Sequence, residues 1–583
     1  MTRSAAAASA PLDAIAQPAA PRARLFALVR TERGQLWIIL AYAGVSGLLT
    51  LAVPLAVQAL VNTIAFESMM QPIIVLSLLL FVAIAFMGLL QAIQAFTVEV
   101  MQQRLFVRVA TDLAYRLPRI QAEVFDQAHG PELVNRFFSV FTVQKAAGLL
   151  LMDGLSLVLQ TVIGLTLLAF YHPVLFEFDL ALIAAIALIL FVLGRGATRT
   201  SIHESKAKFA AAAWLEEIAR DPMLFKAGHA ANFALQRADA LALGYVEARK
   251  THYRVVFRQL IGLLALQAVA SALLLGVGGW LVVQRQLTLG QLVASEFVVA
   301  AVVAGLVKLA KHLETYYDML ASVDKLGHLV ELPLERSGGA APAASSRPAG
   351  LALTGVAYRP GGGAAVVDGL DWAIEPGARI GIVGAHGSGK SMLADMLTGL
   401  RVPSSGAVEL DGVDMRDLEL GALREQITCL RPGGIVAGTV LENLALGRRG
   451  VDLSHARTAL EAVGLWEEVQ ALDAGLDTPL VPGGLPLSPQ EASRLSLARA
   501  IAWQPRLIVI DEALDGLDAE NRARVLDGFF RPDAPWSLVV FTRQTEVMAR
   551  CDALFALARG QLTPIQPPDA KRGKAASKRT PRP

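Results

Sequence analysis

Residues 384 to 391 read Gly384-Ala385-His386-Gly387-Ser388-Gly389-Lys390-Ser391, which matches the pattern G-x-x-x-x-G-K-[ST]. An apolar run, Ile380-Gly381-Ile382-Val383, precedes the stretch and Met392-Leu393-Ala394-Asp395-Met396-Leu397 follows it, so it is expected to join a strand to a helix. Glycines let successive backbone N–H groups turn toward a phosphate at the start of a helix, where the helix dipole also favours negative charge. The flanking strand and helix argue against the alternative of an ordinary glycine-rich turn.

The stretch therefore predicts a loop that binds the phosphates of a nucleotide. Lys390 is expected to reach the β- and γ-phosphates, and the hydroxyl of Ser391 is expected to ligate Mg²⁺. ATP and Mg²⁺ are the cofactors that such a loop implies. The expected nucleotide contacts within it are Gly384, Gly387, Ser388, Gly389, Lys390 and Ser391.

A second chemical feature is the pair Asp511-Glu512, which follows the apolar run Leu507-Ile508-Val509-Ile510. Such a run favours a strand buried on both faces, whose carboxyl end reaches the edge of an α/β sheet where ligands bind. Asp511 is expected to hold Mg²⁺ through water, and Glu512 to position or deprotonate the attacking water as the catalytic residue. Tyr358 is expected to stack on adenine; the alternative is a strand aromatic packed in the core.

Composition places part of the chain in lipid. Hydrophobic residues make up 54% of its 583 residues and charged residues only 18%, which is unlike a soluble protein. A net charge of +2 argues against nucleic acid as the main partner, because few basic residues are in excess to neutralise phosphates. Cys429 and Cys551 lack C-x-x-C spacing, so they indicate neither a disulfide framework nor a metal site.

Six apolar segments predict membrane-crossing helices, since each is close to or above the roughly 20 residues that span hydrocarbon. They cover about 37–60, 72–96, 146–170, 180–197, 259–283 and 289–310. Buried helices of a soluble core are the alternative, which such long apolar runs disfavour. Asp153 and Glu296 fall inside these runs, and either a substrate contact or a solvated position at a helix end is open for each.

Basic residues cluster before the first crossing and in the long connections 97–145 and 198–258, whereas the short loops 62–68 and 171–173 lack them. Both termini are therefore expected in the cytoplasm. The tips of the long connections, 129–136 and 214–222, are expected to form short helices that touch the nucleotide-binding domain, with solvated loops as the alternative.

The chain is expected to divide into an α-helical transmembrane bundle followed by an α/β domain. The predicted parts are a disordered leader at 1–24, a transmembrane domain with stalk and coupling loops at 25–335, a linker at 336–350, a nucleotide-binding domain at 351–560, and a basic disordered tail at 561–583. The leader lacks the uninterrupted apolar core of a secretory signal. For the tail, contact with anionic lipid headgroups is the alternative to a solubilising end.

From about residue 25 to 560 the chain resembles a half-transporter of the ATP-binding cassette (ABC) exporter superfamily, type I, with six helices and a P-loop NTPase domain. A segment before the last crossing is similar to the corresponding segment of bacterial exporters related to peptide, lipid and type I protein secretion. It reads Arg285-Gln286-Leu287-Thr288-Leu289-Gly290-Gln291-Leu292-Val293. The resemblance implies a homodimer or heterodimer of half-transporters in the bilayer of the bacterial inner membrane, in which two cassettes close on ATP and alternate access. A periplasmic adaptor protein is a further partner that it allows.

The chain departs from the family pattern at several motifs. The signature Leu-Ser-Gly-Gly-Gln falls on Leu487-Ser488-Pro489-Gln490-Glu491, which keeps Ser488 as a nucleotide contact but loses both glycines. Proline has no N–H to donate to a γ-phosphate, and the glutamate adds negative charge near a polyanion. The loop Cys429-Leu430-Arg431-Pro432-Gly433-Gly434-Ile435 lacks the expected glutamine, Arg543 stands where the family has a switch histidine, and Met392 replaces a hydroxyl residue.

Losing one group that stabilises a transition state commonly slows an enzyme by about 10² to 10³. Nucleotide binding is therefore expected to be intact and hydrolysis at the chain's own site to be slow, with Arg543 as a partial substitute for the histidine. ATP-dependent export is the leading functional hypothesis. The alternative is a catalytically weak ATP-binding subunit that regulates or supports a heteromeric export complex. Lipid, peptide, small amphiphile and secreted protein all remain open as cargo.

Overall fold

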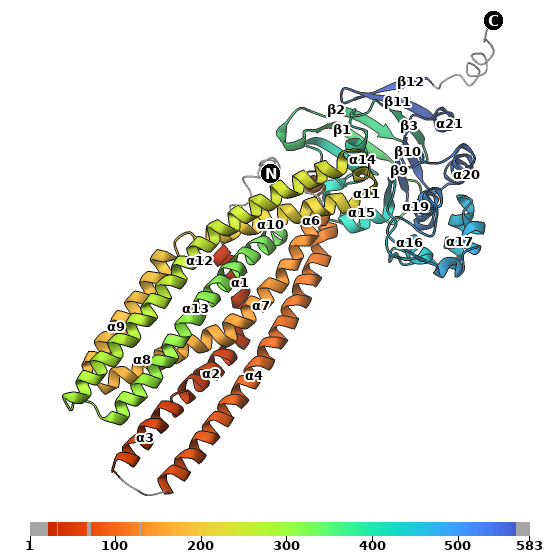
Figure 1. Ribbon diagram of the computed structural model, residues 1–583. Helices are drawn as coiled ribbons and strands as arrows, with labels where there is room; N and C mark the ends of the chain where they lie inside the picture. Colours follow the sequence, from red (N-terminus) through yellow and green to blue (C-terminus); the bar gives the residue numbers. More distant parts are fainter. Residues whose placement is uncertain (1–20, 32, 67–70, 127–129, 567–583) are drawn as a thin grey trace, which may run out of the picture. The chain divides into compact units, whose positions relative to one another are not determined.

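The computed structural model describes residues 21–31, 33–66, 71–126 and 130–566 (Figure 1). The chain forms two compact units. Of the described residues, the helical unit comprises those within 21–119 and 130–332, and the sheet unit comprises 120–126 and 333–566. Residues 1–20 of the expected leader and 567–583 of the expected tail lie outside the described residues. Each unit is described by itself.

The helical unit consists of long helices joined by short turns. Its main helices are α1 (Pro21–Thr31), α2 (Arg33–Leu49), α3 (Ala52–Phe66), α4 (Gln71–Arg116), α7 (Ser139–Leu149), α8 (Leu155–Tyr171), α9 (Pro173–Leu188), α10 (Ala197–Arg220), α12 (Ala230–Val283) and α13 (Leu289–Val330). Short helical segments are η2 (Leu117–Arg119), α6 (Gly130–Asn135), η3 (Arg136–Phe138), η4 (Leu150–Gly154), η5 (Ile189–Leu193) and α11 (Pro222–Phe225). The expected α-helical region is confirmed.

Within the described residues, five helical stretches are long and apolar enough to cross a membrane. They are Arg33–Thr63, Ile73–Arg119, Leu133–Tyr171, Pro173–Leu193 and Ala230–Val283, and a shorter apolar helix covers Leu289–Val302. These agree with the positions of the expected crossings, while the total of six stays a prediction. Helix α4 exposes large apolar side chains such as Ile74 (67%) and Phe81 (69%), as expected of a surface that meets lipid.

The N-terminal boundary differs from the expected one. Residues 21–24, assigned to a disordered leader, begin helix α1, and Arg24 is 8% exposed. Its guanidinium pairs with Asp324 at 2.6 Å and with Glu331 at 2.5 Å, both at the end of α13. A guanidinium is buried only when such partners satisfy its N–H groups, so these ion pairs order the start of the helix.

The sheet unit contains the expected α/β domain. An antiparallel sheet has the order β2-β1-β4-β5, formed by β1 (Leu351–Tyr358), β2 (Val367–Ile374), β4 (Ser405–Leu410) and β5 (Val413–Asp414). A second sheet has the order β12-β11-β3-β10-β9-β6, formed by β3 (Arg379–Val383), β6 (Ile427–Leu430), β9 (Leu507–Asp511), β10 (Ser537–Phe541), β11 (Ala553–Ala558) and β12 (Gln561–Ile565). Residues 561–565, expected in the tail, therefore belong to the sheet.

Helices of the same unit contribute to the two hydrophobic cores in which the strands of this second sheet pack. They are α14 (Lys390–Leu397), α15 (Leu420–Gln426), α16 (Val440–Ala445), α17 (Leu453–Ala462), α18 (Trp466–Gln470), α19 (Pro489–Trp503), α20 (Ala519–Phe529) and α21 (Thr545–Met548). The remaining short elements are α5 (Ala122–Phe125), η6 (Pro360–Gly362), η7 (Met415–Asp417), β7 (Gly438–Thr439), β8 (Pro479–Leu480) and η8 (Gly475–Asp477).

Strand β9 is buried on both faces, as its apolar run predicts. Leu507 and Val509 pack in the core that includes β1 and α14, whereas Ile508 and Ile510 pack in the core under α16 to α20. Strands β3, β10, β9 and β6 are mutually parallel. Their carboxyl ends therefore meet at one edge of the sheet, and the segments that follow them are brought together there.

Residues 120–126 pack with the sheet unit although they lie far from it in sequence. Ile120 forms an isolated antiparallel bridge with Leu334, and the N–H of Gln121 donates to the backbone oxygen of Pro333. The first coupling tip was expected slightly later, at 129–136; residues 130–135 form α6 in the helical unit, and 127–129 lie outside the described residues.

Candidate functional site

The loop 384–391 joins β3 to α14, as its sequence predicts (Figure 1). Gly389, with φ of +95°, is the residue that caps the start of α14. A Cβ atom there would lie 2.7 Å from Cγ1 of Val366, and one at Gly384 would lie 2.5 Å from Oγ of Ser388. Larger residues would therefore clash at either position. The result is a tight backbone turn at a helix N-terminus, the geometry that binds phosphate.

Lys390 lies inside this loop. Its side chain is 6% exposed, and Nζ donates to the backbone oxygens of Gly384 at 3.1 Å and Ala385 at 3.2 Å. Oε1 of Glu512 is 3.6 Å from the same Nζ. The buried Oγ of Ser388 has no hydrogen-bond partner among the described residues. An ammonium and an unpartnered hydroxyl thus lie in one loop, and both can donate to phosphate oxygens.

Asp511 and Glu512 lie at the carboxyl end of β9, next to this loop. Asp511 is 4% exposed; its Oδ2 accepts from Nε of Arg431 at 3.1 Å, while its buried Oδ1 has no partner among the described residues. Glu512 has φ of +60° and a side chain that is 46% exposed. A glutamate rarely adopts a left-handed backbone, and such strain is concentrated at functional sites.

The donor set fits Mg²⁺. The metal would be held by the hydroxyl of Ser391 and the carboxylate of Asp511, which are the oxygen ligands that this ion prefers. The unpartnered Oδ1 of Asp511 needs a ligand of this kind. No group of three or more His, Cys, Asp or Glu residues able to hold a metal occurs in the part of the chain that the structure describes. Phosphate oxygens and water would therefore complete the coordination.

A row of alternating charges leads away from Asp511, and the sequence did not predict it. Arg431 contacts Asp511 and, at 2.5 Å, Oδ1 of Asp395 on α14. Oδ2 of Asp395 accepts from Nε of Arg401 at 2.8 Å. Arg401 then holds both carboxylate oxygens of Asp126 at 2.7 Å. The hydrogen bonds that Arg401 donates, first of all those to Asp126, raise the pKa of Arg401. These charged residues are far apart in the sequence and meet only because of the order of the strands, so local sequence patterns could not predict their contacts.

Tyr358 does not have the expected role. Its ring is 4% exposed and packs in the core with β2 and β4, and its hydroxyl accepts from Nη1 of Arg401 at 3.0 Å. A ring without an open face cannot stack on adenine, so the alternative interpretation, a core aromatic, is the correct one. The last three residues of β1, Val356 to Tyr358, are all buried.

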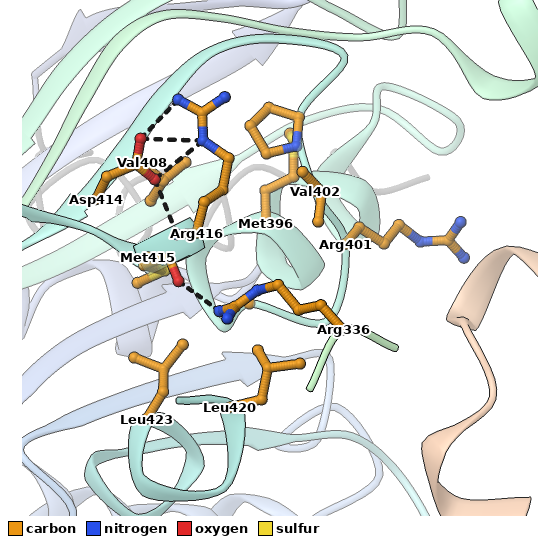
Figure 2. A pocket seen from close by; sticks show the side chains of 12 residues that line it. Arg336, Met396, Arg401, Val402, Val408, Asp414, Met415, Arg416, Leu420 and Leu423 are labelled. Atoms are coloured by element: carbon orange, nitrogen blue, oxygen red, sulfur yellow. Dashed lines mark hydrogen bonds and ion pairs between the residues drawn. The ribbon is translucent and has the colours of Figure 1, made fainter. Parts of the chain in front are cut away.

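Figure 2 shows a small pocket that Arg401 lines. This pocket lies outside the phosphate loop. Arg416 turns toward Asp414 there, with Nη2 2.6 Å from Oδ2, and Arg336 donates to the backbone oxygen of Met415. The guanidinium of Arg401 points away from these side chains. The lining includes neither the phosphate loop nor Asp511-Glu512, so this pocket is not the nucleotide site.

The segment aligned with the signature motif begins α19. Ser488 is its N-cap: Oγ accepts from the N–H of Glu491 at 3.3 Å, and Oε2 of Glu491 accepts from the N–H of Ser488 at 2.7 Å. Pro489 is the first residue of the helix, a position that proline tolerates. The expected nucleotide contact Ser488 therefore already serves a capping box. Arg543 follows β10 and is exposed at the same sheet edge.

Three acids of the helical unit differ in their surroundings. Asp153 lines a cavity of about 660 Å³ with Glu99 and Lys145, whereas Glu296 is exposed. Asp179, which the sequence did not single out, is 4% exposed, and neither carboxylate oxygen has a partner among the described residues. A carboxylate within the apolar stretch Pro173–Leu193 was the available signal.

Comparisons with known proteins agree with this geometry. Residues 367–515 match the family model of the ABC transporter, and residues 36–220 match that of the ABC transporter transmembrane region. The structure is similar to that of a bacterial Atm1-family ABC exporter with ATP bound, with a TM-score of 0.80 and 20% identity over 91% of this chain and 95% of the other. That likeness shows the fold.

The matches to relatives of known name cover only part of each protein. The alpha-hemolysin translocation ATP-binding protein HlyB of Escherichia coli O157:H7 is 24% identical over 324 residues, which are 55% of this chain and 46% of that protein. A multidrug efflux ATP-binding/permease protein of Mycobacterium tuberculosis is 28% identical over 305 residues, 52% of this chain and 26% of that protein. The matched part thus spans about half or less of each of these relatives.

Proposed function

We propose that this chain, which belongs to the ABC transporter superfamily and joins a transmembrane region to a nucleotide-binding domain, works as one half of a dimeric ATP-driven exporter. One observation carries the proposal: the buried Lys390 and the acids Asp511 and Glu512 converge on one sheet edge, in a chain that also contains long apolar helices. The names of the relatives, which refer to toxin translocation and multidrug efflux, support export as the direction of transport.

The residues of the site would divide the work of ATP hydrolysis. Lys390 and Ser388 bind and orient the phosphates, and Glu512 positions the attacking water near the phosphate that Lys390 holds. Mg²⁺, when bound by Ser391 and Asp511, neutralises charge on the phosphate oxygens. Burial of Lys390 and Asp511 excludes bulk water, which strengthens each electrostatic contact to the nucleotide.

Hydrolysis at this chain's own site is proposed to be slow. Pro489 has no N–H to offer, and the hydroxyl of Ser488 is engaged in capping α19. Glu491 brings a negative charge to the same turn. In a homodimer both sites would carry these changes; in a heterodimer a more complete cassette would face this segment. Arg543, exposed at the sheet edge, is proposed to neutralise γ-phosphate charge in place of a histidine.

The membrane arrangement follows the distribution of basic residues. The chain is a multi-pass membrane protein, and we place it in the bacterial inner membrane with both termini in the cytoplasm. The phosphate loop then faces cytoplasmic ATP. A second half-transporter is the required partner, and a periplasmic adaptor would extend the path for a secreted cargo.

A regulatory subunit is the second candidate, and the capping box of Ser488 and Glu491 favours it. A serine committed to holding its own helix is less free to close on the nucleotide of a partner. Retention of Glu512 at the carboxyl end of β9 favours the exporter, because a purely structural cassette has no need of that acid.

ATP hydrolysis by the full-length protein in proteoliposomes separates the candidates. We expect wild-type protein, alone or with a neighbouring half-transporter, to exceed the rate of Glu512→Gln by at least about tenfold. Glu520→Gln, an exposed acid on α20, is the matched control and should hydrolyse as wild type does. Rates equal to the Glu512→Gln background in every preparation would exclude the exporter and leave the regulatory subunit.

A further inference from the structure

Arg431 lies beside Asp511, in the loop 429–435 where the family pattern has a glutamine. Its Nε is 3.1 Å from Oδ2 of Asp511, and its Nη2 is 2.5 Å from Oδ1 of Asp395 and 3.3 Å from the backbone oxygen of Ser391. One side chain thus touches both residues that would hold Mg²⁺. The Arg431 side chain is 40% exposed, so part of it remains accessible to a bound ligand.

The fold positions this side chain firmly. Strand β6 pairs with β9 in parallel, with Leu430 opposite Ile510, so the next residues, Arg431 and Asp511, lie side by side at the carboxyl ends of these strands. Asp395, whose side chain is 6% exposed, anchors the guanidinium to the helix of the phosphate loop. Asp395 also pairs with Arg401, so its charge would remain compensated if Arg431 were replaced.

A guanidinium cannot do what an amide would do here. It has five N–H donors and no acceptor, and it stays charged at any physiological pH. It therefore cannot ligate a metal, and its positive charge opposes a divalent cation at the same carboxylate. The same charge attracts phosphate oxygens and can form charge-assisted hydrogen bonds with them.

We propose that Arg431 is a built-in cation of the nucleotide site, which partly replaces Mg²⁺ and lets the protein bind the metal-free nucleoside triphosphate. The inference depends on the proposed function, because it assumes that ATP occupies the loop 384–391. It goes further in assigning a ligand-binding role to a residue outside that loop and in naming the ionic form of the nucleotide that the site accepts.

The test compares ATP binding to full-length protein in nanodiscs, by equilibrium dialysis of radiolabelled ATP, with excess MgCl₂ and with excess EDTA. For wild-type protein we expect the dissociation constants to differ by no more than about threefold. For Arg431→Gln, whose amide oxygen can ligate the metal, we expect EDTA to weaken binding by about tenfold or more, the size of a charged hydrogen bond. Arg431→Lys keeps the charge and should stay close to wild type.

Arg424→Gln is the matched control, since Arg424 forms a similar two-point pair with Glu335 in the same unit, away from Asp511. It should not alter the response to EDTA. A second readout uses Mn²⁺ as a paramagnetic substitute for Mg²⁺: electron paramagnetic resonance should show tighter Mn²⁺ binding to the ATP complex of Arg431→Gln than to wild type.

The outcomes distinguish this inference from the proposed function. Equal sensitivity to EDTA in wild type and Arg431→Gln, with equal Mn²⁺ affinity, would overturn the role of Arg431 while ATP binding itself survived. A strict requirement for Mg²⁺ in wild type would do the same, even if Arg431→Gln failed to fold. Absence of ATP binding under every condition would instead overturn the proposed function.

Discussion

Nζ of Lys390 lies 3.6 Å from Oε1 of Glu512, although the two residues belong to distant parts of the sequence. Lys390 begins α14 after β3, and Glu512 follows β9, with β10 between the two strands in the sheet. Parallel strands bring both residues to one edge. The ammonium expected to hold the phosphate and the acid expected to hold the water are thus neighbours before any ligand binds.

Replacing Lys390 by alanine should weaken ATP binding by about 10- to 100-fold. The change removes a charged donor, whose hydrogen bonds are worth about 1.5–3 kcal/mol. Equilibrium dialysis with the full-length protein measures the dissociation constant for ATP. Arg457→Ala, which removes an exposed cation from α17, should bind ATP as wild type does. Unchanged affinity in Lys390→Ala would show that the loop does not bind the triphosphate.

Replacing Glu512 by glutamine should retain ATP affinity within about threefold and reduce hydrolysis by about 10² or more, since a general base commonly contributes that factor. The side chain is 46% exposed, so its replacement should not disturb folding. Single-turnover hydrolysis measures the chemical step directly. Loss of affinity together with rate would mean that Glu512 acts on binding and not on the attacking water.

Ser488 and Glu491 should respond differently to substitution. Ser488→Ala removes an N-cap, which should cost about 1 kcal/mol and lower the melting temperature of the full-length protein. Glu491→Gln keeps an acceptor for the N–H of Ser488 but removes the charge, so stability should hold while ATP hydrolysis rises. An unchanged hydrolysis rate in Glu491→Gln would show that this charge does not limit the site.

Lys325 should make stability depend on pH. It lies on α13 beyond the apolar stretch Leu289–Val302, and its Nζ is 3.0 Å from the centroid of the Phe209 ring. Burial lowers the pKa of Lys325 from 10.5 to about 7, with nearby Lys208 and Arg136 contributing. The unfolded chain therefore binds more protons than the folded chain between those pH values, and the free energy of unfolding rises with pH there.

The melting temperature of the full-length protein should accordingly increase from below pH 7 to pH 9, and Lys325→Met should flatten that increase. Lys226→Met, an exposed lysine at the end of α11, is the control and should leave the slope unchanged. A slope that is the same in wild type and Lys325→Met would assign the pH dependence to other groups.

Asp179→Leu should raise the melting temperature. Leu175 and Leu182, on the same face of α9, pack in an apolar cluster, and Asp179 lies between them with both oxygens unpartnered among the described residues. A buried polar group without a hydrogen bond costs about 1–3 kcal/mol. Glu177→Leu, on the exposed side of the same helix, should change the melting temperature little. Destabilisation by Asp179→Leu would indicate a partner for the carboxylate.

Local sequence patterns were enough to predict the main helices and strands of the fold and the phosphate loop. The apolar segments of the helical unit, the loop before α14 and the two acids at the carboxyl end of β9 all depend on residues adjacent in sequence. Periodicity and glycine placement report such features directly. The sequence also indicated that the segment 487–491 departs from the family pattern, although not that Ser488 caps α19.

Tertiary structure alone decided which distant side chains meet. Arg431 contacts Asp511 because β6 pairs with β9, and strand order is not encoded in local periodicity. Burial of Tyr358 depends on the pairing of β1 with both β2 and β4. The ion pair of Asp126 with Arg401 needs residues 120–126 to pack with a unit formed by residues much later in the chain. Contacts of this kind arise from the packing of whole elements, so no stretch of sequence contains them.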